Sequence, residues 1–272
     1  MPKSLFEIKN LKYKRGGQNQ LSISNFEIHR GIAYAITGQP GSGKTTFLEL
    51  LAGRLKPQQG TLTFDGYERG SAEFRTKYNE EVYYLAQAPV RAWGKVSKYM
   101  SRNIRLAAWS TDSIDTRLKS ISKLFSLGDK LDRKIRALSP GERRWIDMAV
   151  ALASDAKVLI IDELEQHTSF DELDLVKRQL QRKCNYEGIT VILSTLNPGT
   201  IRRLSGVSVT LDRGRIAMIR SVRDGGRTRK PQSGGVSNRG SGQTGRKRSG
   251  RSSARQSPPT KSTRRTNNGN SK

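Results

Sequence analysis

Apolar and polar positions alternate in places over the first thirty residues. The apolar positions there are Leu5, Ile8, Leu11, Leu21, Ile23, Phe26 and Ile28. Such alternation is typical of strands that bury one face and expose the other. We therefore predict short antiparallel strands over residues 1–30, and a further short strand at 61–64 before an Asp-Gly turn.

Three later runs are apolar almost throughout, at 32–36, 158–161 and 189–193. Short continuous apolar runs are typical of parallel strands that are covered on both faces. Residues 45–55 and 95–135 instead carry apolar side chains at helical spacing, and helical patterns also precede the second and third runs. This order predicts an α/β fold with an antiparallel β subdomain in its N-terminal part and a helical subdomain near the middle.

Residues 38–45 read Gly-Gln-Pro-Gly-Ser-Gly-Lys-Thr and match the phosphate-binding pattern G-x-x-x-x-G-K-[ST] between a predicted strand and a predicted helix. Gly41 and Gly43 allow the backbone to curl so that its N–H groups can hold a β-phosphate. Lys44 would place its charge on the β- and γ-phosphates, and the Thr45 hydroxyl would bind Mg²⁺. The alternative is a glycine-rich turn that binds nothing, and the flanking strand and helix argue against it. The predicted nucleotide contacts of this P-loop are Gly38, Gln39, Pro40, Gly41, Ser42, Gly43, Lys44, Thr45 and Thr46.

Two carboxylates directly follow the apolar run at 158–161. Side chains at the carboxyl ends of parallel strands lie where α/β sheets bind ligands. Asp162 would hold Mg²⁺ through a water molecule, and Glu163 would polarise the attacking water as general base. The alternative is a pair of solvated acids without a role, which the presence of a P-loop in the same chain disfavours.

Residues 138–144 read Leu-Ser-Pro-Gly-Glu-Arg-Arg and predict the start of a helix. Ser139 and Glu142 have the spacing of a capping box, and Pro140 suits the first helical position. A well-capped helix is therefore part of the explanation. The same helix N-terminus presents free N–H groups and a hydroxyl to an anion, although nothing within one chain identifies that anion.

Taken together, these segments resemble the nucleotide-binding subunit of ATP-binding cassette (ABC) transporters over about residues 3–220. The resemblance implies a P-loop NTPase core that binds ATP and Mg²⁺ and hydrolyses the ATP. Residues 138–142 match the signature motif of that family, whose Ser139 and Gly141 would contact the γ-phosphate bound to the opposite subunit. The resemblance thus implies a head-to-tail dimer, with a second copy or another cassette subunit, that holds two ATP molecules between its subunits.

Further positions follow from the resemblance one by one. Tyr13 matches the aromatic residue that stacks on adenine, and an ordinary strand tyrosine is the alternative. Gln87 matches the glutamine that senses Mg²⁺ and the attacking water, at the start of the helical insert that touches the membrane partner; a loop glutamine without a role is the alternative. Residues 211–216 match a closing hairpin. The implied metal ligands are Thr45, Gln87 and Asp162, and the implied catalytic residues are Glu163 and Gln87.

Two departures from the family pattern bear on hydrolysis. Leu196 stands where a switch histidine is expected, and it cannot donate a hydrogen bond to a γ-phosphate. After Glu163, the aspartate of the family falls on Ser169 or, if the loop is shifted, on Asp171. Losing one γ-phosphate contact predicts a turnover lower by roughly 10²–10³-fold. His167 is the candidate replacement, although a loop histidine more often has no such role.

Half of the net charge of +26 falls in the last 52 residues, 221–272. This segment holds 14 basic residues and one acid but no aromatic ring, and its few apolar side chains cannot offset the entropy lost on ordering. We predict an ATP-binding domain over 1–220, with a helical insert at about 88–150, and a disordered basic tail over 221–272. The basic clusters would attract nucleic acid or anionic lipid; a solvated tail without a partner is the alternative.

Composition and hydropathy restrict the location and role of the chain. A single cysteine, Cys184, excludes an intramolecular disulfide and fits a reducing compartment. No apolar stretch reaches the ~20 residues that cross a bilayer, and the first ten residues lack a secretory core. We expect a cytoplasmic protein, peripheral on the cytoplasmic face of the inner or plasma membrane, that drives transport through separate membrane-spanning subunits. A faint likeness of 197–203 and 211–216 to exporters of capsule or other surface polysaccharides favours export, and a general exporter fits as well. The alternatives are a soluble ABC ATPase acting on nucleic acid or ribosomes, and a weakly hydrolysing regulatory cassette.

Overall fold

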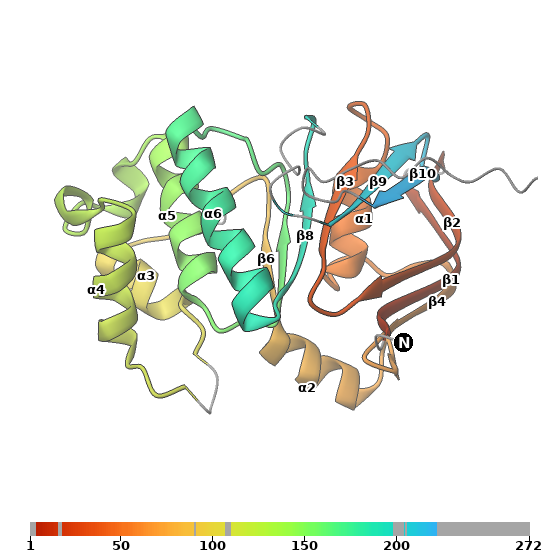
Figure 1. Cartoon of the computed structure of the whole chain (residues 1–272), viewed down its shortest axis with the longest axis horizontal. Helices are drawn as coiled ribbons and strands as arrows, with labels where there is room; N and C mark the ends of the chain where they lie inside the picture. Colours follow the sequence, from red (N-terminus) through yellow and green to blue (C-terminus); the bar gives the residue numbers. More distant parts are fainter. Residues whose placement is uncertain are drawn as a thin grey trace, which may run out of the picture. The chain divides into compact units, whose positions relative to one another are not determined.

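The computed structural model describes residues 4–15, 18–89, 91–106, 110–197, 204 and 206–221 (Figure 1). Nearly all of the predicted disordered tail, residues 222–272, lies outside this part of the chain. The described strands form two sheets, one of four strands and one of six. The fold is thus the α/β arrangement with an antiparallel subdomain that the sequence predicts.

The smaller sheet is antiparallel and has the strand order β2-β1-β4-β5. Its strands are β1 (Ser4–Arg15), β2 (Gln18–His29), β4 (Gln59–Phe64) and β5 (Tyr67–Glu68). The antiparallel strands expected near the start of the chain are confirmed, since β1 pairs with β2 and places Ile8 opposite Phe26. Alternate side chains point to one face of this sheet. On the buried face Phe6 and Phe64 pack with ring centroids 4.9 Å apart.

The larger sheet has the strand order β10-β9-β3-β8-β7-β6, and all its neighbours pair in parallel except β9 and β10. Its strands are β3 (Ala33–Thr37), β6 (Val82–Leu85), β7 (Val158–Ile161), β8 (Thr190–Ser194), β9 (Val207–Asp212) and β10 (Arg215–Ser221). The three predicted buried strands correspond to β3, β7 and β8, and β9 with β10 forms the expected closing hairpin. Sequence analysis did not identify β6, because its four residues are too few to show a pattern.

The α-helices in the described ranges are α1 (Lys44–Leu51), α2 (Ala72–Glu81), α3 (Val96–Asn103), α4 (Ile114–Leu124), α5 (Pro140–Ala153) and α6 (Phe170–Glu187). Helix α1 ends earlier than the pattern over 45–55 predicts, because the chain turns at Gly53, whose φ is +67°. The predicted pattern missed α2, which buries few residues and lacks an apolar stripe. None of these helices is long and apolar enough to span a bilayer.

Side chains of the larger sheet alternate between two apolar clusters. Leu159 and Ile161 of β7 pack into the cluster that contains residues of α3, α4, α5 and α6. Val158 and Ile160 of the same strand pack into the cluster that contains residues of α1 and of the smaller sheet. Burial on both faces explains why β7 is apolar at every position.

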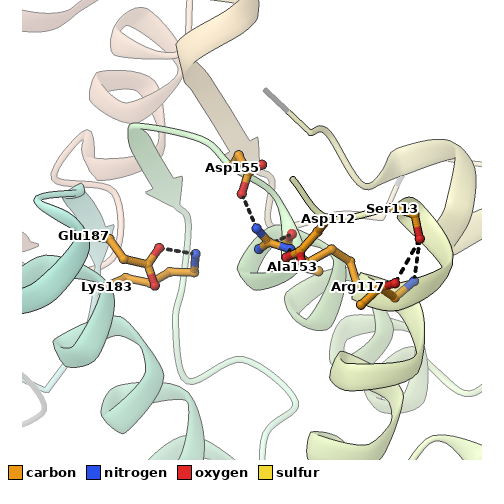
Figure 2. A network of polar contacts seen from close by, with 8 residues as sticks. Asp112, Ser113, Arg117, Ala153, Asp155, Lys183 and Glu187 are labelled. Carbon is orange, nitrogen blue, oxygen red and sulfur yellow. Dashed lines mark hydrogen bonds and ion pairs between the residues drawn. The ribbon is translucent and has the colours of Figure 1, made fainter. Parts of the chain in front are cut away.

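Arg117 of α4 fixes the carboxyl end of α5. Its guanidinium group pairs with Asp112, donates to the carbonyl oxygen of Ala153 at 3.5 Å and pairs with Asp155 at 2.9 Å (Figure 2). These contacts lie at the end of α5 opposite to Pro140, its first residue. Helix α5 is therefore anchored to the neighbouring helix at the end that is remote from its predicted anion-binding N-terminus.

Candidate functional site

The P-loop connects β3 to α1 and depends on its glycines. Gly38, Gly41 and Gly43 have φ angles of +143°, +80° and +102°, a region that other residues avoid. A Cβ atom at Gly38 would lie 2.3 Å from the carbonyl oxygen of Leu211, so the backbone also passes too close to β9 for a side chain. The local sequence thus produces a curled loop at the carboxyl end of the sheet.

Lys44 is buried within this loop. Its Nζ donates to the carbonyl oxygen of Gly38 at 2.8 Å and to that of Gln39 at 3.1 Å. Burial lowers the pKa of Lys44, and the negative charges of Glu163 and Asp162 oppose this shift. The ammonium group therefore lies within electrostatic reach of both predicted carboxylates.

The first turn of α1 adds backbone donors to the loop. The N–H groups of residues 44–46 have no intrahelical partner, whereas the N–H of Phe47 donates to the carbonyl oxygen of Gly43 at 2.9 Å. Ser42 Oγ is buried and lacks a partner among the described residues. Free N–H groups, a helix N-terminus and a lysine together form a cradle that fits a phosphate group.

Asp162 and Ser194 join the ends of β7 and β8. Asp162 is fully buried, and its Oδ1 accepts a hydrogen bond from Ser194 Oγ at 2.6 Å. Its Oδ2 lacks a partner within the described part of the chain. Burying an unpaired carboxylate oxygen is costly unless a ligand compensates it. The free oxygen and the half-buried Thr45 hydroxyl are the hard oxygen donors that Mg²⁺ prefers, so these residues fit that ion.

Glu163 occupies a strained turn directly after Asp162. Its φ is +48°, and its N–H donates to Ser194 Oγ at 2.7 Å. The Glu163 side chain is half-buried at the end of β7. Its negative charge raises the pKa of Lys44, against the larger lowering by burial. This position is suited to a carboxylate that accepts a proton from a water molecule near the phosphates.

Gln87 lies two residues beyond β6 and lines a cavity of about 330 Å³. Pro140, Arg144 and His167 line the same cavity. A Cβ atom at Gly141 would lie 3.3 Å from the carbonyl oxygen of His167, so the start of α5 packs closely on the turn that follows Glu163. The predicted glutamine and the predicted signature segment therefore meet at one cavity.

Ser139 is the exposed N-cap of α5 and belongs to a complete capping box. Its Oγ accepts from the N–H of Glu142 at 3.2 Å, and Glu142 Oε2 accepts from the N–H of Ser139 at 2.9 Å. The bond from the Ser139 backbone and the pairing with Arg133 at 2.7 Å lower the pKa of Glu142. Within the described residues of one chain, no hydrogen bond or cavity links Ser139 to the P-loop. Its contact with a nucleotide stays a prediction.

The remaining predicted residues lie on or next to β1, β8 and α6. Tyr13 of β1 is half-buried and packs against the apolar cluster of the smaller sheet, and its stacking on adenine stays a prediction. Leu196 follows β8 and is 60 % exposed. Ser169 is the N-cap of α6 and accepts from the N–H of Glu172 at 3.3 Å, while Asp171 lies in the first turn of that helix.

Two residues of the site were not identified from the sequence. Ser194 bridges the backbone of Glu163 and the carboxylate of Asp162, as described above. Arg144 is buried on α5, with its guanidinium directed at backbone carbonyl oxygens at the ends of β6 and β7. No local sequence pattern marks either residue, because the groups that they contact are distant in the sequence and become neighbours only in the folded chain.

The P-loop follows β3, Ser194 ends β8 and the two carboxylates follow β7, and these three strands are consecutive in the larger sheet. A phosphate cradle beside a carboxylate with a free oxygen defines the class of P-loop nucleotide-binding proteins. A family model described as ABC transporter matches residues 21–166, which is more than half of the chain. The chain belongs to this family, as its sequence motifs indicated.

Individual relatives agree with this assignment. The sulfate/thiosulfate import ATP-binding protein CysA of Bradyrhizobium diazoefficiens is 29 % identical over 225 residues, covering 80 % of this chain and 64 % of the relative. The methionine import ATP-binding protein MetN of the same organism is 27 % identical over 218 residues, covering 76 % of this chain and 61 % of the relative. The chain thus spans a little less than two thirds of the length of these relatives.

Solved structures confirm the fold. The ATP-binding subunit of an ABC transporter superposes with a TM-score of 0.71 at 22 % identity, covering 80 % of this chain and 90 % of that one. A dimeric ATP-binding cassette in a post-hydrolysis state bound to ADP and Pi gives a TM-score of 0.68 at 21 % identity, covering 80 % and 99 %. The predicted P-loop cassette core is therefore confirmed.

Proposed function

We propose that the chain binds Mg·ATP and hydrolyses it as the ATP-binding subunit of an ABC transporter. The observation that carries the proposal is that the P-loop with Lys44 follows β3 while Asp162 and Glu163 follow β7, so all lie at the carboxyl edge of one set of parallel strands. The relatives named above support a role in transport. They are import proteins by name, so they give no support to the export direction expected from the sequence, and we favour import.

Each residue has a defined task in this mechanism. Lys44 and the N–H groups of the loop bind the β- and γ-phosphates, and Thr45, Asp162 and Gln87 would hold Mg²⁺. When bound, Mg²⁺ neutralises charge that develops on the phosphate oxygens. Glu163 accepts a hydrogen bond from a water molecule and takes its proton as the water oxygen attacks the γ-phosphorus. The bond from that phosphorus to the oxygen that bridges to the β-phosphate breaks, so ADP leaves with the bonding electron pair and inorganic phosphate forms.

The exposed N-terminus of α5 supports a head-to-tail dimer. Gly141 lies in the first turn of α5, where a backbone N–H group lacks an intrahelical partner and attracts an anion, and the exposed Ser139 caps that turn. In the proposed dimer they bind the γ-phosphate held by the other copy. Each nucleotide then lies between the P-loop of one chain and α5 of its partner.

Dimerisation of a slowly hydrolysing variant tests this arrangement. Glu163→Gln removes the proton acceptor, and we expect turnover to fall by about 10²–10⁴-fold while ATP remains bound. Sedimentation velocity should then show an ATP-dependent shift from monomer to dimer. Adding Ser139→Arg should abolish the shift, because a large cation blocks the N-terminus of α5.

Two control variants separate the interface from folding and nucleotide binding. Ser113 is the exposed N-cap of α4, so Ser113→Arg should dimerise normally in the same background. Lys44→Ala should not dimerise, because we expect its ATP affinity to fall about 100-fold with the loss of a charged phosphate contact. A normal dimer with Ser139→Arg would contradict the role given to α5.

Leu196 favours a second candidate, a cassette that binds ATP and regulates a partner with little hydrolysis. The exposed leucine supplies no hydrogen bond at the position of the switch histidine. ATPase turnover distinguishes the candidates: a rate unchanged by Glu163→Gln would indicate binding without Glu163-dependent hydrolysis. The nucleic-acid and ribosome alternative depends on the basic tail, which lies outside the described residues.

A groove of about 460 Å³ beside the edge strand β6 is our proposed docking site for the membrane-spanning subunit. Its lining includes four aromatic residues and four arginines, namely Tyr83, Tyr84, Trp93, Tyr99, Arg54, Arg91, Arg102 and Arg105. Asp147 is the acid among its described lining residues, and it is engaged by the Tyr99 hydroxyl at 2.7 Å and by Arg143 at 3.0 Å. The excess of positive charge favours a partner segment with acidic side chains.

Copurification from membranes tests this docking site. We expect the full chain to be isolated in detergent with a multi-spanning protein at moderate salt. Arg102→Glu should reduce that yield by about tenfold, because it reverses one charge of the groove. Arg178→Glu, on the exposed face of α6, is the matched control and should leave the yield unchanged. Equal yields for both variants would contradict docking in the groove.

A further inference from the structure

Arg144 of α5 contacts the backbone at the ends of two strands. Its Nη1 donates to the carbonyl oxygen of Ala86 at 2.6 Å. Its Nη2 donates to the carbonyl oxygen of Asp162 and, at 3.1 Å, to that of Glu163. Ala86 directly precedes Gln87, so one guanidinium group contacts the backbone at or next to three of the four residues to which we assign metal binding or catalysis, namely Gln87, Asp162 and Glu163. The fourth is Thr45 of the P-loop.

Packing alone does not account for an arginine at this position. Arg144 is only 4 % exposed, and its Nε lacks a partner among the described residues. Burial lowers the pKa of Arg144, but an arginine keeps its charge in proteins. Its hydrogen bonds within the described residues go to carbonyl oxygens, which compensate a buried charge less well than a paired carboxylate. An apolar side chain would fill the same space without that cost.

The turn at Glu163 needs external support. A residue other than glycine with a φ of +48° is strained, and such a conformation persists only where surrounding groups fix it. The peptide unit before Glu163 donates its N–H to Ser194 Oγ at 2.7 Å and offers its carbonyl oxygen to Arg144. The peptide unit after Glu163 donates its N–H to the carbonyl oxygen of Ser194 at 3.1 Å and offers its carbonyl oxygen to Arg144.

Both peptide units that flank Glu163 are therefore held on each side, by Ser194 on one and by Arg144 on the other. We propose that Arg144 is a positioning residue, which fixes the turn so that the Glu163 carboxylate is directed at the attacking water. The proposal rests on the proposed ATP hydrolysis. It requires that loss of Arg144 lowers the rate of hydrolysis much more than it weakens ATP binding.

Steady-state kinetics of the full chain tests the proposal. Arg144→Met keeps much of the side-chain volume but removes every donor, and we expect kcat to fall by about 10–100-fold. KM and the Kd for ATP should change by no more than about threefold, because the P-loop is untouched. Arg144→Lys retains a charge that reaches fewer carbonyl oxygens, so it should restore part of kcat. It also serves as the second variant if Arg144→Met folds poorly.

A second substitution separates positioning from general destabilisation. In the Glu163→Gln background, Arg144→Met should lower single-turnover rates by less than about twofold, because the carboxylate that it positions is gone. Arg117→Met is the matched control, since it also removes guanidinium contacts to α5, at the carbonyl of Ala153. It should leave the kcat of the folded chain unchanged. An equal kcat loss in Arg117→Met, or an undiminished loss in the Glu163→Gln background, would overturn the proposal.

Backbone hydrogen exchange distinguishes failure of this inference from failure of the proposed function. In Arg144→Met the amides of residues 163 and 164 should exchange at least about tenfold faster, whereas Arg117→Met should not affect them. This readout does not need ATP hydrolysis. If the unsubstituted chain shows no Glu163-dependent turnover, the proposed function fails. If exchange at these two amides is unchanged in Arg144→Met, the role proposed for Arg144 fails, whatever the turnover.

Discussion

The two turns of the site are held in different ways. Lys44 and glycines that lie within eight residues shape the P-loop, and the lysine bonds back to carbonyls five and six residues before it. The turn at Glu163 is instead held by Arg144 and Ser194, which lie 19 residues before it and 31 residues after it. The conformation of the phosphate cradle therefore depends mainly on residues close to it in the sequence. The position of the general base depends on contacts with a distant helix and a distant strand.

Breaking the local turn should have the largest effect. Gly38→Ala would place a Cβ atom 2.3 Å from a backbone oxygen of Leu211 and 2.6 Å from Ser42 Oγ. We expect the free energy of unfolding to fall by about 3 kcal/mol, measured by chemical denaturation. Gly41→Ala is the matched control, because no atom of the other described residues lies within 4 Å of its Cβ beyond its chain neighbours. Only its φ of +80° is unfavourable, which costs about 1 kcal/mol. Equal losses would show that close approach to β9 does not limit the loop.

Breaking the non-local turn should have a smaller effect on stability and a clear effect on turnover. Ser194→Ala removes the donor to Asp162 Oδ1 and the acceptor for the N–H of Glu163. We expect a loss of about 2 kcal/mol in the free energy of unfolding and a fall in kcat of about tenfold. Ser122→Ala is the control, since Ser122 Oγ is also buried but lacks a partner in the described chain. Turnover that falls equally in both variants would contradict the support that Ser194 gives to Glu163.

The same distinction decides what could be predicted from the sequence. The P-loop, the buried strands and the capping box at Ser139 could be predicted, because each signal lies within a few residues. Ser194 and Arg144 could not, because a serine ending a strand and an arginine following a helix cap have many explanations until their partners are known. The interpretation of Ser169 shows a missed local signal. Its spacing to Glu172 is that of a capping box, which by itself predicts the start of a helix at this serine.

Helix α5 has a consequence for how the subunit communicates. Its 14 residues span about 21 Å, with Ser139 at the tip, Arg144 in the second turn and Asp147 on the wall of the groove beside β6. In the proposed docking, an occupant of the groove that displaces α5 would move Ser139 and Arg144 together, because both belong to the same helix and its cap. The docked partner would then act on the proposed dimer contact at Ser139 and on the turn at Glu163 through one helix.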